Sequence, residues 1–213
     1  MFGIIPKSLV VWCGRRFMSN TTMSLVSKLK YFLDNRKPVT HIQNYCDFNF
    51  LMDQLPGWPS MYKHGFVEHE SLIHFDKAEK IFTKMLKYLI EKNIPPHLGA
   101  IKVHRSDDFL MSFALEGFSF GFDIPLSENN SSELSEAMKE LNQIILEEEG
   151  LVYFAKDQFL TTSQTKLMYR NYDKFLTLKN RWDTNELFQS NTYRRIFKNQ
   201  SYIQKSPSGL TYS

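Results

Sequence analysis

Hydrophobic residues between about positions 65 and 155 recur first every two residues and then every 3.6, and each change of period predicts a new element. Residues 66–73 alternate between two faces, as a β-strand does, and Glu68 and Glu70 share one face. Residues 76–92 then carry an apolar stripe at helical spacing, which a double proline ends. This part of the chain therefore begins with a strand and an amphipathic helix.

The same alternation of periods continues downstream. Strands are predicted over 98–104 and 117–124, a second amphipathic helix over 131–148, and a fourth strand over 151–154. In the third strand, three phenylalanines occupy one face, and Ser119 lies on the other. The order strand, helix, strand, strand, helix, strand predicts an α+β, ferredoxin-like fold, with one antiparallel sheet and both helices on one face.

The remaining segments complete the expected organisation. An irregular or helical segment is expected over 1–64, with a helix at 22–35 and a loop at 55–59. A ferredoxin-like substrate domain follows over 65–157. After it we expect C-terminal helices over 158–197 and a disordered tail over 198–213.

Composition excludes several classes of protein. The chain has 213 residues, 42% of them hydrophobic, which is enough to build a core, and its formal net charge of +3 indicates no nucleic-acid partner. The two thiols, Cys13 and Cys46, fit a reducing cytoplasm, and neither they nor the histidines have the spacing of a metal site. The apolar N-terminus is too interrupted to span a membrane, so only a peripheral membrane contact stays open.

Four segments carry a resemblance to a known family. They are GFSFGFDIP (117–125), GLVYFAKDQ (150–158), MYRNYDKFLTLKNRWD (168–183) and ELFQSNTYRRI (186–196). In order and spacing they resemble the C-terminal, substrate-side part of FAD-linked oxidases of the decaprenylphosphoryl-ribose oxidase kind. The resemblance implies an oxidoreductase that acts on a sugar hydroxyl. The glycine-rich phosphate loops of a flavin domain do not occur in this chain, so we expect it not to bind FAD alone but to need a separate FAD-binding domain or subunit.

The resemblance also suggests site residues. It places Tyr153 and Lys156 between the flavin ring and the sugar, as the candidate catalytic pair, because such groups can orient a hydroxyl and stabilise developing charge. Lys102 and Ser119 occupy positions that face the substrate in relatives. The sheet face opposite the helices covers the flavin in relatives, so an exposed apolar patch is expected there.

Three sets of candidate residues can be explained either by a functional role or by an ordinary structural role. Glu68 and Glu70 are spaced for acid–base work on a substrate, or for a solvated sheet face. Arg194 and Arg195 are spaced for cofactor phosphate, or for an ordinary surface. Lys156 itself is equally compatible with a surface lysine at a strand end.

The sequence also has features of three other classes of protein. The topology also suits an RNA-recognition module, but Glu116 and Asp123 stand where that module needs a cation and an aromatic ring. An aldonolactone oxidase carries a different segment where this chain has Ala155-Lys156-Asp157. The chain is also compatible with a non-catalytic remnant or partner-binding domain, as an alternative to an active subunit.

Overall fold

The computed structural model describes residues 6–36, 40, 42, 44–49, 57–198, 204–205 and 211–212. The chain divides into two compact units, Met1–Phe66 and Val67–Ser213. Each unit is described by itself. The finer division into a substrate domain over 65–157 and a separate C-terminal segment stays a prediction.

The first unit is helical where it is described. Its elements are α1 (Lys7–Phe17), α2 (Asn20–Asp34), α3 (Tyr45–Asn49) and a 3₁₀ helix, η2 (Trp58–Met61). The predicted helix at 22–35 is confirmed by α2, which starts two residues earlier because Ser19 caps it and accepts a bond from the Thr22 amide at 3.2 Å. Helix α1 was not predicted. Leu55 and Pro56 of the predicted loop lie outside the described residues.

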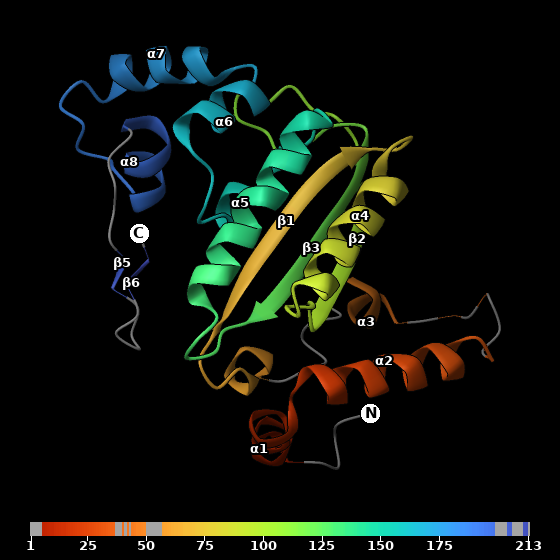
Figure 1. The fold of residues 1–213 in the computed structure, drawn as a ribbon. Helices are drawn as coiled ribbons and strands as arrows, with labels where there is room; N and C mark the ends of the chain where they lie inside the picture. Colours follow the sequence, from red (N-terminus) through yellow and green to blue (C-terminus); the bar gives the residue numbers. More distant parts are fainter. Residues whose placement is uncertain are drawn as a thin grey trace. The chain divides into compact units, whose positions relative to one another are not determined.

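The second unit confirms the predicted fold class. The elements follow as β1 (Phe66–His74), α4 (Ala78–Glu91), β2 (Leu98–His104), β3 (Gly117–Pro125), α5 (Ser131–Glu147) and β4 (Leu151–Val152). They form one antiparallel sheet in the order β2-β3-β1-β4, in which β1 is central (Figure 1). Strand β4 is shorter than expected, because Phe154–Lys156 turn into a 3₁₀ helix, η3.

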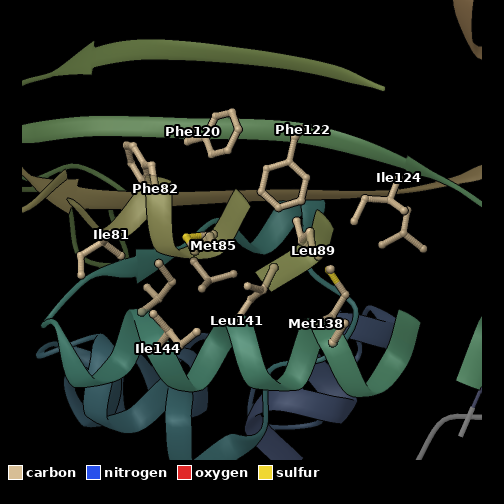
Figure 2. Close-up of a cluster of buried hydrophobic side chains, with 14 of the residues drawn as sticks. Ile81, Phe82, Met85, Leu89, Phe120, Phe122, Ile124, Met138, Leu141 and Ile144 are labelled. Carbon is tan, nitrogen blue, oxygen red and sulfur yellow. The ribbon is translucent and has the colours of Figure 1, made fainter. Parts of the chain in front are cut away.

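Both long helices cover the same face of this sheet, as predicted. Phe120, Phe122 and Ile124 of β3 point toward side chains of α4 and α5 in one apolar cluster (Figure 2). The cluster excludes water almost completely: Met85, Leu89, Met138, Leu141 and Ile145 have no exposed surface. Neither α4 nor α5 therefore covers the other face of the sheet.

The C-terminal helices follow β4, as predicted after Thr161. They are α6 (Thr162–Met168), α7 (Tyr172–Trp182) and α8 (Asn191–Lys198). Thr161 and Gln164 form a capping box that starts α6. Most of the predicted disordered tail lies outside the described residues, which include only the short paired strands β5 (Gln204–Lys205) and β6 (Thr211–Tyr212). Among the described helices, none is both long and apolar enough to cross a bilayer.

Candidate functional site

The candidate site lies on the sheet face that α4 and α5 leave uncovered. The alternation of each strand puts Glu68 and Glu70 of β1 on this open face, with Ser119 of β3 beside them. Lys102 of β2 stands directly opposite Ser119 in the β2–β3 register, so it shares this face. Residues from three neighbouring strands therefore converge on one surface.

Glu70 is the centre of this surface. Its side chain is only 3% exposed, and its carboxylate accepts bonds from Lys102 Nζ at 3.0 and 3.3 Å and from Ser119 Oγ at 2.9 Å. Gly121 leaves the room for it: a Cβ at that position would lie 3.2 Å from Glu70 Cδ and Oε2, closer than most side chains pack. The carboxylate is therefore held by partners on β2 and β3.

Lys156 reaches the same carboxylate from the other side. Its Nζ lies 3.2 Å from Glu70 Oε2 and 3.3 Å from Glu68 Oε1. We call Glu68, Glu70, Lys102, Ser119 and Lys156 the Glu70 cluster. Five of the eight residues suggested by the sequence are thus brought within direct contact of one another.

The charges in the cluster stabilise each other. Burial raises the pKa of Glu70, but hydrogen bonds from Lys102 and Ser119 and the charges of Lys102 and Lys156 outweigh it, and the pKa lies below its usual value. Burial lowers the pKa of Lys156, but the charges of Glu70 and Glu68 raise it by more, so the pKa lies above its usual value. At neutral pH Glu70 is therefore an anion and Lys156 a cation, so Lys156 can donate hydrogen bonds but cannot act as a neutral base.

Asp123 is the unusual carboxylate of this face. It lies on β3, two residues beyond Gly121, and is 5% exposed. Its Oδ2 has no hydrogen-bond partner among the described residues. Burial and the nearby charge of Glu68 raise its pKa to about 7, with Lys156 acting in the opposite direction. Near neutral pH this carboxyl group can therefore either accept or release a proton.

Tyr153 borders the cluster without joining its hydrogen bonds. Its amide donates to the Glu70 carbonyl at 2.8 Å, which continues the β1–β4 pairing, and its ring packs on Phe113 at 4.9 Å. Phe113 also contacts the ring of His104, whose Nε2 lies 2.9 Å from Ser119 Oγ. An aromatic border from the 105–116 loop therefore flanks the charged centre.

The two arginines lie apart from the cluster and differ from each other. Arg195 pairs with Asp157 Oδ2 at 2.7 Å and also donates to the backbone carbonyls of Asp157 and Leu160. Asp157 in turn accepts the amides of Phe159 and Leu160 at 2.9 Å. Arg195 thus fixes the segment that follows Lys156. Arg194 donates to Gln189 Oε1 at 2.9 Å, and a role of either arginine with cofactor phosphate stays a prediction.

One expectation for this face is wrong. A large apolar patch was expected opposite the helices, but the residues there are mainly charged or polar, and Tyr153 is the main exposed aromatic among them. The physical reason is visible in β3, where the positions between the buried aromatics are Ser119, Gly121 and Asp123.

Sequence reasoning missed Asp123 and His104 as members of the site. The available signal was the alternation of β3 and β2, which puts both on the same face as Ser119 and Lys102. No group of three or more His, Cys, Asp or Glu side chains in the described residues has the geometry of a metal site.

Comparison with known proteins gives a distant relationship to oxidoreductases. No protein-family model matches the chain. A relative is the decaprenylphosphoryl-β-D-ribose oxidase of Mycolicibacterium smegmatis, with 24% identity over 157 residues, which cover 73% of this chain and 33% of the relative. The chain therefore spans about a third of the length of the curated relative that it matches.

Proposed function

We propose that this chain supplies the substrate-side domain of an FAD-dependent oxidoreductase that oxidises a sugar hydroxyl, with the flavin held by a separate domain or subunit. The observation that supports this best is the Glu70 cluster, in which two lysines from different elements meet a buried carboxylate on the open sheet face. The resemblance of the 117–125 and 150–158 segments to sugar oxidases supports a substrate at the same face.

The charges of Lys156 and Asp123 suggest a separate role for each residue in the oxidation. Oxidation of a carbinol requires that its hydroxyl proton leave while the hydride departs to an acceptor, which the flavin would provide. The Lys156 ammonium can hold the hydroxyl oxygen, and Asp123, with a pKa raised to about 7 by burial and by Glu68, can take the proton. Tyr153 and Phe113 would pack against the apolar side of the sugar ring.

The first test measures substrate binding by the chain without flavin. A short-chain polyprenylphosphoryl-β-D-ribose is titrated into the protein labelled for NMR, and amide shifts are expected in β1, β3 and η3. Lys156→Ala should weaken binding at least about tenfold, the effect of losing one charge-assisted hydrogen bond. Lys87→Ala, an exposed lysine on the helical side, is the matched control and should bind as the wild type does.

A second test restores the reaction. Fused behind the flavin-binding part of the M. smegmatis relative, the wild-type chain should support flavin reduction by the ribose substrate, and Lys156→Ala should slow it at least about tenfold. Unfolding by urea should change by less than about 1 kcal/mol in the variant, because Glu70 keeps Lys102 and Ser119. Equal rates of flavin reduction would argue against the proposal.

One observation favours a second candidate, a non-catalytic or partner-binding domain. Both lysines of the cluster already pair with Glu70, so their charge is satisfied without a ligand. In this case the ribose ligand should cause no shifts on the open face, and Lys156→Ala should leave flavin reduction in the fusion unchanged.

A further inference from the structure

Helix α2 presents an apolar face that the described residues of its unit leave exposed. None of its residues is buried. Five of its large apolar side chains are between 48% and 69% exposed: Leu25, Val26, Leu29, Phe32 and Leu33. So many exposed apolar groups on one helix indicate a surface that binds something.

These five side chains form one stripe with cations along its edges. At about 100° per residue, they occupy an arc roughly 120° wide on the helix. Lys28 projects on one side of this arc and Lys30 on the other, where Lys30 also pairs with Asp34. Ser24, Ser27, Tyr31 and Asp34 occupy the opposite face. The helix is therefore amphipathic, with a lysine on each border.

The surrounding sequence is strongly basic. Residues 6–36 hold six lysines and arginines and a single carboxylate, Asp34, whereas the whole chain has a formal net charge of only +3. Arg36 stacks on Phe32, with its guanidinium 3.9 Å from the ring centroid. A cation is thus held at the apolar stripe itself.

We propose that α2 lies in the surface of an anionic lipid bilayer, with its apolar stripe inserted among the acyl chains and Lys28, Lys30 and Arg36 at the phosphates. This arrangement matches interfacial helices, in which apolar residues enter the boundary of the hydrocarbon and basic residues reach back to the headgroups. The excess of cations over the single carboxylate of residues 6–36 favours an anionic lipid surface over a protein partner, which is the other outcome of the test. The inference does not depend on the proposed catalytic function.

Helix α1 adds to the same surface chemistry. Trp12 and Phe17 are each 57% exposed, and Arg15 and Arg16 lie between them in the sequence. The opposite side of α1 is occupied, since Gly14 packs against Met61. Aromatic and basic side chains exposed together are typical of contacts with the interfacial region of a bilayer.

The experiment is sedimentation of the full chain with vesicles, either phosphatidylcholine alone or phosphatidylcholine mixed with phosphatidylglycerol. We expect binding to the anionic vesicles, weakened by added salt, and at least tenfold less binding to the neutral ones. Leu29→Glu should reduce binding at least tenfold by breaking the stripe. Lys28→Glu combined with Lys30→Glu should do the same on anionic vesicles only.

Matched control variants distinguish a specific loss of vesicle binding from an unspecific effect of adding negative charge to the surface. Leu167→Glu changes an exposed leucine of α6, and Lys84→Glu with Lys87→Glu reverses two exposed lysines of α4, and neither should alter vesicle binding. Circular dichroism checks that each variant keeps its helices. The proposal is wrong if the wild-type chain fails to sediment with anionic vesicles, or if Leu29→Glu binds them normally. Loss of self-association by Leu29→Glu without any vesicle binding would instead show that α2 docks on protein.

Discussion

The two faces of strand β3 are built by different forces, although their residues alternate along a single segment. Phe118, Phe120 and Phe122 point to the helices and are held by close packing of apolar volume. Ser119 and Asp123 point the other way, where hydrogen bonds and charges decide the arrangement. The helical face holds the buried apolar core, whereas the open face holds a carboxylate with one oxygen that has no hydrogen-bond partner among the described residues.

The largest expected effect is on the helical face. Leu141→Ala removes a side chain with no exposed surface from the core shown in Figure 2, and should lower the free energy of unfolding by about 2–5 kcal/mol. Urea unfolding followed by circular dichroism measures the change. Leu167→Ala, at a leucine that is 71% exposed, is the control and should change stability by less than about 0.5 kcal/mol. Equal effects of the two substitutions would contradict the contrast between the faces.

An intermediate effect is expected at the centre of the open face. Glu70→Gln keeps the shape but removes the charge that Lys102 and Lys156 share, and should cost about 1–3 kcal/mol, since both lysines can partly regain water. Glu68→Gln is the matched control, because its side chain is 33% exposed and contacts only Lys156 in the cluster. It should cost less than about 1 kcal/mol. If Glu70→Gln is no worse than Glu68→Gln, the buried carboxylate does not organise this face.

An effect of similar size, which depends on pH, is expected at Asp123. Burial and Glu68 raise its folded pKa from 3.8 to about 7, so the folded protein binds this proton more tightly than the unfolded chain. The group then favours folding at low pH, and this contribution is lost as pH rises from about 4 through 7. Asp123→Asn should therefore gain about 1–3 kcal/mol relative to the wild type when pH is raised from 5 to 8.

His69, on the helical face, changes the folding stability with pH in the opposite direction. Burial lowers its pKa from 6.5 to about 4, so stability is lost as pH falls through this range. The wild type alone can thus show a nearly flat profile between pH 4 and 7. The difference between the wild type and Asp123→Asn isolates Asp123, because His69 is present in both. Asp108→Asn, at an exposed carboxylate, is the control, and the same pH dependence for both variants would refute the assignment.

The elements that form the two faces of the sheet could be predicted from the sequence. Strong alternation in β1 and β3 and strong helical periodicity in α4 and α5 identified these elements and the faces of their residues. In the structure β1 lies between β3 and β4, and this position lets Glu70 meet lysines from both sides. A short helix such as α1 was missed because its apolar residues are interrupted by Lys7 and Gly14.

Contacts between distant segments were beyond the sequence. Nothing in the spacing indicates that Arg195 pairs with Asp157, since 38 positions and two helices separate them. Periodicity likewise cannot show that Asp123 is buried without a partner for Oδ2, because this depends on what surrounds it in three dimensions. The apolar patch was wrongly expected because it was inferred from relatives and not from the alternation of β3.

The Arg195–Asp157 pair also bears on the order in which the site forms during protein synthesis. Strands β1, β2 and β3 leave the ribosome before residue 157, and can pair as soon as they emerge. The turn that carries Lys156 is additionally held by a guanidinium on α8, which is translated later. A nascent chain paused between these points would hold a nearly finished sheet but lack this guanidinium contact to Asp157, so ribosome-bound chains that stop before and after position 195 should differ most in the protection of residues 153–160 from proteases.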